Sequence, residues 1–393
     1  MSLKDFLKAQ LHDIRDYGMY IAFIVIVIFF TVKTEGLFVS SRNIGNLVNA
    51  TSYIAVLAVG MTLVIVIRHI DLSIGFLAGT LGAVAAIALK YWLLPVYATI
   101  PLVLILGIIA GLLTAFLVAK MRIPAFVATL AGWLGYKGLL QLVTIKTGTI
   151  IINDKVFNDL GNGFIPDIPG LEFLPGIHKV TLLLGVLAIV LFVIGEINNR
   201  RKTQAYHFEV SPMNVFILKL VFISLIIAGI TWILSGYQGL SWAAFILIII
   251  VLIYSYMATK TVVGRHIYAV GGNPEAAELN GISVKRITYL VFASMGFLTA
   301  VAGILYASWL RSATTIAGTG MELDAIAAAF VGGVAVAGGV GKISGSILGA
   351  LVMASLTNGM NLLGWDLSIQ FIVRAFVLAG AVIFDVQTRK TVK

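Results

Sequence analysis

The sequence contains no cysteine, and this absence excludes several kinds of chemistry. Without cysteine the chain has no disulfide framework, no thiolate metal site and no cysteine nucleophile. Its five histidines are scattered, and none belongs to an HExxH pair or a similar metal-binding pattern. No cluster of nucleophile, acid and base emerges elsewhere, so the sequence does not predict an enzyme.

Charged residues are also scarce, at 11% of the chain, whereas 60% of the residues are hydrophobic. A soluble domain usually carries about 25% charged residues. A soluble chain this apolar could not cover its surface with polar groups, but a lipid bilayer needs no such cover. The composition therefore predicts a membrane protein. The net charge of +10 then indicates a cytoplasmic surface rich in Lys and Arg rather than a nucleic-acid partner.

Apolar runs continue almost from end to end, and a spanning helix needs about 20 such residues. The sequence predicts an all-α, polytopic membrane helix bundle with about 10–12 transmembrane segments, some of them short or broken. The segments near 72 and 322 are the short or Gly-rich ones. The candidate segments are 19–34, 51–67, 72–89, 93–119, 125–145, 180–195, 215–234, 242–258, 288–310, 322–338, 342–362 and 368–384.

The distribution of Lys and Arg predicts the orientation. With the N-terminus inside, inner loops and tails carry 18 of these residues and outer loops and helix ends carry 8, while Arg374 lies within the last helix. Positive charge favours the cytoplasmic side, so both termini are expected to be cytoplasmic. The first residues lack an apolar core followed by a cleavage site, so they predict an amphipathic lead-in rather than a removed signal peptide.

We expect a single transmembrane domain over 1–393, divided by its soluble segments. These are a cytoplasmic lead-in, an extracytoplasmic loop, an extra helical hairpin, a cytoplasmic loop and a cytoplasmic tail, at 1–17, 146–179, 180–234, 259–287 and 385–393. A weak internal repeat is also visible. An offset of 270 places Gly75 and Gly79 on Gly345 and Gly349. Recurring small residues in any transporter would explain the same match, so duplication is left open.

The inner loop contains the sequence GRHIYAVGGNPEAAELNGISVKR, which predicts a short capped helix. Asn273 is a good N-cap, and Pro274 fits the first helical position, where a missing N–H costs nothing. Glu275 lies in the first turn, where the helix dipole favours negative charge. Gly281 suits the C-terminal cap. These capping residues alone are equally typical of an ordinary helix on a cytoplasmic surface.

Polar residues interrupt the apolar sequence in RHIDLSIGFLAG, residues 68–79. Arg68 and Asp71 are costly at membrane depth and usually face protein or water there. One interpretation is a tight turn in which Asp71 caps the next helix through the amides of Ser73 and Ile74. The other is a discontinuous helix that lines a path through the membrane. We favour the turn and cap.

A second polar feature is the pair Asn358 and Asn361, which lie one helical turn apart in a Gly- and Ala-rich stretch. Amide side chains donate and accept hydrogen bonds, so they suit hydroxyl groups on a passing ligand. A hydrogen bond between helices is the alternative, and it is the better explanation for either residue alone. The GGVGK within the same stretch lacks the spacing of a phosphate-binding loop.

Taken in order from about residue 17 to 385, several motifs resemble the permease subunits of ATP-binding-cassette (ABC) sugar importers of the ribose/xylose/galactose class. The length and the hairpin at 180–234 look most like the xylose and multiple-monosaccharide permeases. Glu275-Ala276-Ala277 followed by Gly281 resembles the EAA loop of such importers, although the Leu-Pro that continues the family pattern is missing. The matching motifs are DYGMYIAFIVIVIFF, VGMTLVIVIRHIDLSIG, RIPAFVATLAG, GRHIYAVGGNPEAAELNGI, ELDAIAAAFVGG with AGGVGK, GFIPD and NGM.

The resemblance implies a homodimer in the bacterial inner membrane that works with a duplicated ATPase subunit and an extracytoplasmic sugar-binding protein. ATP and Mg would bind the ATPase, so no cofactor is expected in this chain. The coupling residues implied by the resemblance are Arg265, Gly272, Asn273, Glu275, Ala276, Ala277 and Gly281. The candidate path or gate residues are Asn358, Asn361, Asp71 and Arg68.

The cargo implied by the resemblance is a monosaccharide such as xylose, galactose, glucose or arabinose, and the sequence does not choose among them. A permease of the same class for a nucleoside or a signalling sugar is one alternative. An ion-coupled secondary carrier is another, and it would need a carboxylate in the membrane as its ion site. In the sequence, Asp71 is the only plausible residue for that role.

Overall fold

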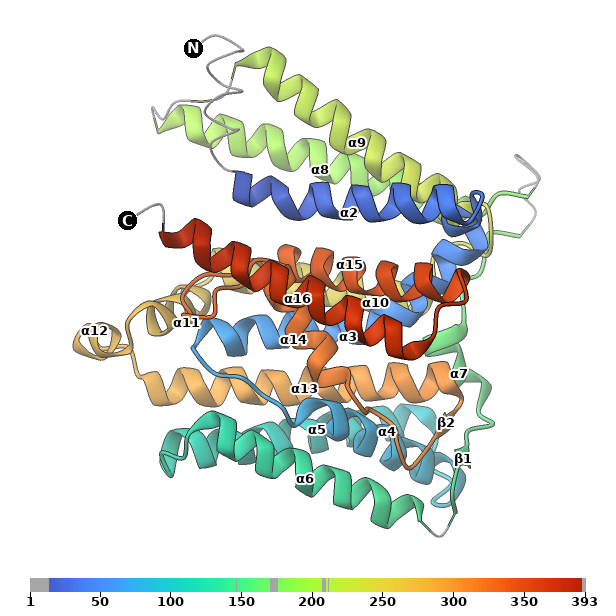
Figure 1. Cartoon of the computed structure of the whole chain (residues 1–393), viewed down its shortest axis with the longest axis vertical. Coiled ribbons are helices and arrows are strands. Elements are labelled where there is room, and N and C mark those ends of the chain that lie inside the picture. The colour runs from blue at the N-terminus through green and yellow to red at the C-terminus, as the bar shows by residue number, and fades with distance from the viewer. Residues whose placement is uncertain (1–13, 146, 170–175, 207–209, 211, 391–393) are drawn as a thin grey trace.

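The computed structural model describes residues 14–145, 147–169, 176–206, 210 and 212–390, and these form a helical bundle (Figure 1). The predicted all-α fold is confirmed, and each of the twelve predicted segments overlaps a long helix or the short helix α14. The predicted lead-in at 1–17 lies largely outside the described residues, and so do the last three residues of the predicted tail. The membrane-region helices are α2 (Ile14–Lys33), α3 (Ser41–Val66), α4 (Ile74–Lys90), α5 (Val96–Ala115), α6 (Ala125–Thr144), α8 (Lys179–Ala205), α9 (Met213–Ser235), α10 (Trp242–Lys260), α13 (Val284–Leu310), α14 (Met321–Val331), α15 (Ile343–Leu362) and α16 (Leu367–Lys390).

Within the described residues, eight helices are long and apolar enough to cross a membrane, and α4 is among the shorter apolar ones. The helix α14 has only 11 residues. At 1.5 Å per residue it covers about 16 Å, roughly half of a bilayer core about 30 Å thick. Non-helical segments separate α3 from α4 and α14 from α15. The predicted short segments near 72 and 322 are therefore the broken elements of the bundle.

The loops and short elements lie at two opposite ends of the bundle (Figure 1). One end holds the start of α2, the end of α16, and the short helices α11 (Val262–Gly272) and α12 (Pro274–Leu279). The other end holds α7 (Lys155–Asn162) and the two-residue strands β1 (Ile150–Ile151) and β2 (Ser312–Ala313). The strands pair antiparallel, with Ile150 opposite Ala313. The loops predicted to be inner and outer thus lie on opposite sides.

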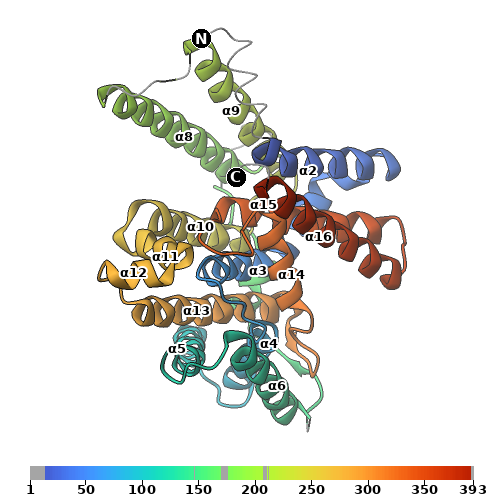
Figure 2. The same ribbon diagram turned by 60° about the vertical axis from the view of Figure 1, so that its left-hand side comes forward.

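The helices α3 and α13 form the centre of the bundle. In the most apolar 18-residue stretch of α3, 78% is buried inside the chain, whereas the corresponding share in α9 is 0%. Helix α13 approaches α5 closely because Gly296 faces Gly107, where a side chain would overlap the opposing backbone. The hairpin of α8 and α9 stands apart at one edge in both views (Figures 1 and 2). Its aliphatic surface is therefore free to contact lipid.

The two broken helix pairs have the same layout, helix then break then helix. The offset of 270 residues places α4 almost on α15, and residues 51–61 of α3 on α14. Ala55 and Ala58 of α3 pack in one cluster with Ala328 of α14 and Ala350 of α15. The two segments of the weak repeat therefore lie side by side, and each contains a break between two helices.

Candidate functional site

The predicted short helix exists as α12, and its ends follow the predicted capping. The Asn273 side chain accepts a hydrogen bond from the Ala276 N–H at 3.1 Å, and Pro274 occupies the first turn together with Glu275. Gly281 has a φ of 80°, the left-handed conformation that glycine adopts without strain. Local sequence therefore determines where this helix begins and ends.

The orientation of α12 corrects one expectation. Ala277 was one of the coupling residues implied by the resemblance, but its side chain is only 4% exposed and packs in the main hydrophobic core of this chain. A larger residue there would overpack this chain before it touched another protein. Glu275 and Glu278 are exposed instead, and Leu279 is 90% exposed. Leu279 was not among the predicted coupling residues, although it is the apolar group that α12 presents outward.

Arg68 connects the broken α3–α4 pair to the start of α12. Its Nε donates to the Gly271 carbonyl at 2.7 Å, and its Nη2 donates to the Gly272 carbonyl. Hydrogen bonds from a charged donor are stronger than neutral ones. Arg68 itself has a φ of 67°, which is uncommon for a residue with a side chain. A predicted gate residue and a predicted coupling residue thus meet directly.

The segment between α14 and α15 joins the same place. The Gly339 N–H donates to the Val66 carbonyl at 2.8 Å, and the Tyr268 hydroxyl of α11 donates to the Gly341 carbonyl at 2.6 Å. Gly338 has a φ of 80°, and a Cβ there would overlap the Arg68 side chain. We call the contact of segments 66–73, 271–273 and 338–341 the three-way junction. It links both breaks in the membrane helices to α12.

Asp71 lies in the first of these segments and forms the predicted turn, but not the predicted cap, because Ser73 is the N-cap residue of α4 and no side chain makes a capping hydrogen bond there. Its side chain is buried, and Oδ1 accepts hydrogen bonds from the Ser73 N–H at 2.9 Å and the Ser73 hydroxyl at 2.6 Å. These bonds order the non-helical segment just before α4. The carboxylate is therefore engaged within its own turn.

The two asparagines of α15 do not join the junction. Asn358 exchanges amide hydrogen bonds with Asn43 of α3 at 2.9 and 3.1 Å. The Asn361 carbonyl accepts from the Gln370 amide of α16 at 2.8 Å. Both side chains hold helices together, which was the alternative to the predicted role on a path.

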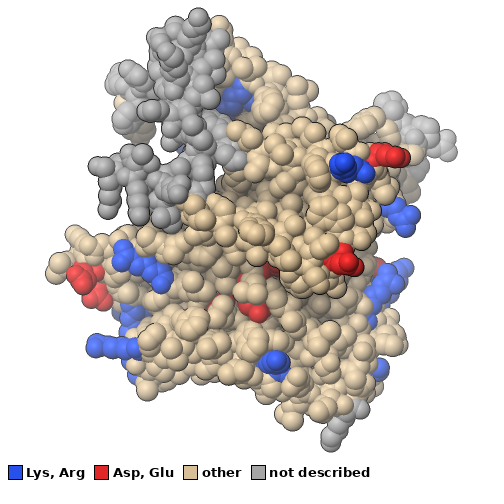
Figure 3. Space-filling model, viewed as in Figure 1, with Lys and Arg blue, Asp and Glu red and all other residues tan. Residues whose placement is uncertain are grey.

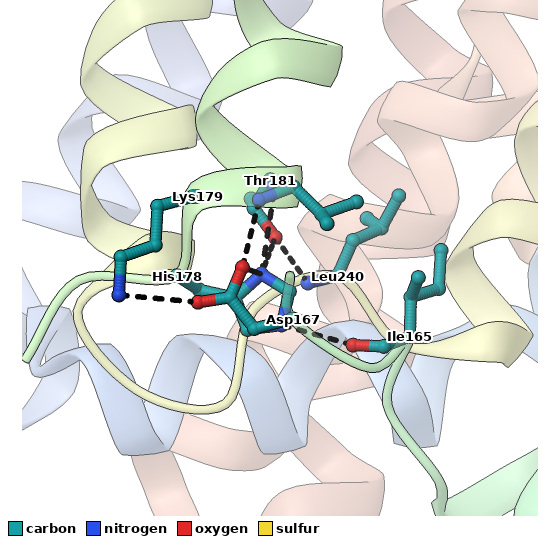
Figure 4. Close-up of polar contacts among 7 residues, drawn as sticks. Ile165, Asp167, His178, Lys179, Thr181 and Leu240 are labelled. Atoms are coloured by element: carbon teal, nitrogen blue, oxygen red, sulfur yellow. Dashed lines mark hydrogen bonds and ion pairs between the residues drawn. The ribbon is translucent and has the colours of Figure 1, made fainter. Parts of the chain in front are cut away.

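At the opposite end, His178 and Asp167 fasten the α8–α9 hairpin to the rest of the chain (Figure 4). His178 Nε2 is 2.9 Å from the Ile165 carbonyl, and the Leu240 N–H donates to the Thr181 hydroxyl at 2.8 Å. Asp167 accepts from the Val180 N–H at 3.0 Å and pairs with Lys179 at 3.5 Å. The first turn of α8 is thereby held by a loop that precedes it.

Several groups act on the acidity of Asp167. Partial burial by itself would raise its pKa, but the backbone N–H groups of Val180, Lys179 and Ile168 and the nearby His178 outweigh that effect. Together they lower the pKa from 3.8 to about 2. The charged form of the Asp167 carboxylate is thus more stable in the folded chain than in the unfolded chain.

Asp167→Asn is expected to lower the unfolding temperature of the purified protein at neutral pH. Because the folded pKa is depressed, the stabilisation by the carboxylate is complete above about pH 4 and is lost as the pH falls toward 2. The difference in unfolding temperature between wild type and Asp167→Asn should therefore shrink on acidification. Thermal melts between pH 7 and 3 measure this, with the exposed Asp366→Asn as control. A difference that does not change with pH would contradict the assignment.

The sequence matches, over residues 43–382, a protein family described as branched-chain amino acid transport system, permease component. The xylose transport system permease protein XylH of Haemophilus influenzae is 38% identical over 98% of this chain and 99% of its own length. This chain belongs to that permease family. The xylose permease XylH of Escherichia coli is 36% identical over 96% of this chain and 93% of its own length. The ribose import permease protein RbsC of Escherichia coli is 34% identical over 93% of this chain and 92% of its own length. No solved structure matches the permease significantly.

Family membership makes the chain a membrane transport subunit and not an enzyme, as predicted. In the part of the chain that the structure describes, no three His, Asp or Glu side chains are grouped so that they could hold a metal ion. The sequence located α12 and singled out Arg68, which the structure places in the three-way junction. It did not reveal Leu279 or Gly338, because nothing local indicates which way α12 turns or where the 332–342 segment packs.

Proposed function

We propose that the permease forms the membrane path of an ATP-driven importer for a monosaccharide, with xylose as the first candidate. The observation that carries this proposal is the similarity to xylose permeases over nearly the full length of both chains. The similarity to ribose permeases is somewhat lower but covers almost the same length. A five-carbon sugar is therefore favoured over galactose or glucose.

The coupling step is supported by the geometry of α12 and the three-way junction. Helix α12 projects at the end of the bundle that holds the start of α2 and the end of α16, with Leu279 and Glu275 exposed. We infer that an ATPase subunit binds this surface, and that its movement displaces α12. Arg68 would pass that displacement to the breaks between α3 and α4 and between α14 and α15. These two units would then open or close the path.

The path itself would lie between two copies of the permease, and a sugar-binding protein would dock at the end that holds α7, β1 and β2. The chain would reside in a bacterial inner membrane. ATP and Mg belong to the ATPase partner in this scheme.

The test is reconstitution of the permease in vesicles with its ATPase and its sugar-binding protein. ATP-dependent uptake of labelled xylose is expected, with less uptake of ribose and none of leucine. Uptake that needs a proton or sodium gradient and continues without ATP would favour an ion-coupled carrier. Uptake of a nucleoside in preference to xylose would favour that alternative within the same class.

The orientation is a separate prediction, and the absence of cysteine makes it simple to test. Val156 of α7 is 66% exposed and Tyr206 at the end of α8 is 75% exposed. In right-side-out vesicles, an impermeant thiol reagent is expected to label Val156→Cys and to leave Tyr206→Cys unlabelled, because positive charge marks the cytoplasmic side. Labelling of Tyr206→Cys alone would reverse the orientation.

A further inference from the structure

Two carboxylates lie inside the membrane region at the start of α14. Glu322 is 6% exposed, and its Oε1 accepts a hydrogen bond from the Trp133 indole N–H at 3.0 Å. Trp133 is near the middle of α6, about 12 Å from its first residue at 1.5 Å per residue. Figure 3 likewise shows acidic atoms near the middle of the face, where α14 begins. In the sequence, Asp71 was the only plausible intramembrane carboxylate, so this corrects that expectation.

The start of α14 faces the start of α4. A side chain at Gly75, in the first turn of α4, would overlap Oε2 of Glu322, and the carbonyl of Gly318 lies close by. The carboxylate is therefore packed against the first turn of α4 as well as the first turn of its own helix. Both helix ends carry positive partial charge, which stabilises a carboxylate there. The glycine at position 75 makes this close approach possible.

Glu322 is only half satisfied in this arrangement. Its Oε2 is buried and has no hydrogen-bond partner within the described part of the chain. A buried acceptor without a partner costs free energy, so it is uncommon unless a ligand or another group completes it. The Trp133 ring is fixed beside it by edge-to-face contact with Phe76, with ring centroids 4.9 Å apart.

A second carboxylate, Asp324, lies in the same first turn of α14, on a different side of the helix from Glu322. Asp324 pairs with Arg374 of α16 at 2.7 Å, and their side chains are 35% and 18% exposed. Leu323 and Ile316, on either side of the start of α14, are 60% and 72% exposed. This chain therefore leaves the start of α14 uncovered on one side. Lys137 lies over the Trp133 ring at 5.1 Å, which adds a positive charge nearby.

We propose that the first turn of α14, together with Trp133, is the point at which the permease contacts its sugar in transit. This rests on the proposed function and names a site for it. The carboxylates of Glu322 and Asp324 accept hydrogen bonds from hydroxyl groups, and Arg374 donates to them. The flat indole of Trp133 provides an apolar surface for a sugar ring.

The chemistry of the site selects a neutral, hydroxyl-rich ligand. The positive ends of α4 and α14 already face a carboxylate of this chain, so they offer little to an anion. Asp324 and Arg374 balance each other, so a cation gains little there. Glu322 acts both as an acceptor and as the residue that holds Trp133 in position.

Uptake by substituted permeases in the reconstituted vesicles tests the site. Trp133→Phe removes a hydrogen bond to a charged group and Glu322→Gln removes the charge, so each is expected to lower the maximal rate of xylose uptake about tenfold. ATPase binding should remain at the wild-type level. The matched controls are Trp232→Phe on the exposed face of α9 and Asp366→Asn in an exposed loop, and both should transport normally.

A binding readout that does not depend on transport uses the cysteine-free background. Leu323→Cys is expected to react with a small thiol reagent, and xylose present during turnover should slow that reaction at least about threefold. L-glucose should not slow it. Leu225→Cys on α9, which is 65% exposed, is the control and should be insensitive to sugar.

The outcomes separate this proposal from the proposed function. If wild-type vesicles do not take up xylose with ATP, the proposed function fails. If they do, but Trp133→Phe and Glu322→Gln transport normally and xylose leaves Leu323→Cys labelling unchanged, the site at α14 is wrong and the proposed function stands. If Glu322→Gln does not fold, Trp133→Phe and the labelling experiment decide.

Discussion

Leu279→Asp is expected to abolish copurification of the ATPase with the permease and to reduce ATP-dependent sugar uptake to background. Leu279 is 90% exposed on α12, so its side chain is free to enter an apolar site on a partner. Burying a leucine contributes about 1.5–3 kcal/mol, and burying an unpaired carboxylate instead is strongly unfavourable. Together these effects lower an association constant by more than about a hundredfold.

Tyr206→Asp is the matched control for this substitution. Tyr206 is 75% exposed at the same end of the bundle, but it lies at the end of α8 rather than on α12. The control should copurify with the ATPase like the wild type. Normal ATPase binding by Leu279→Asp would show that α12 does not dock through this side chain, and the coupling surface would have to be sought elsewhere.

Arg68→Ala is expected to separate ATP hydrolysis from transport. The ATPase should remain bound, because Arg68 is not on the exposed surface of α12, but sugar uptake should fall by about tenfold or more. The physical reason is the loss of two charge-assisted hydrogen bonds to the carbonyls of Gly271 and Gly272. Movement of α12 would then no longer displace the breaks in the membrane helices. The number of ATP molecules hydrolysed per sugar, measured in the same vesicles, should rise accordingly.

Three further variants sharpen this test. Arg68→Lys keeps one charged donor but loses the forked geometry, so partial coupling is expected. Gly338→Val should imitate Arg68→Ala, because its side chain would overlap Arg68. Arg122→Ala is the control, since Arg122 is also an exposed arginine with positive φ, 58°, but lies outside the junction. Equal ATP-to-sugar ratios in Arg68→Ala and wild type would contradict the role of the junction.

Helix identity and helix ends were predicted from the sequence because their causes are local. Lipid-facing helices need long apolar runs, so the segments could be located by composition alone. Asn273, Pro274 and Gly281 specify the ends of α12 through bonds and φ values within a few residues. The extra hairpin of α8 and α9 was located for the same reason, since its residues are aliphatic nearly all round.

The tertiary structure alone decided which side chains meet and which face outward. Ala277 and Leu279 are two positions apart on one helix, yet one is buried and the other exposed, because α12 packs on α11 and α13 from one side only. Arg68 reaches carbonyls about 200 residues away in the sequence, and Glu322 reaches Trp133 at a similar separation. Such contacts depend on how helices pack against one another, and no pattern within a single helix encodes them. The sequence by itself therefore determined a membrane bundle with the short capped helix α12, and packing determined the junction and the polar turn of α14.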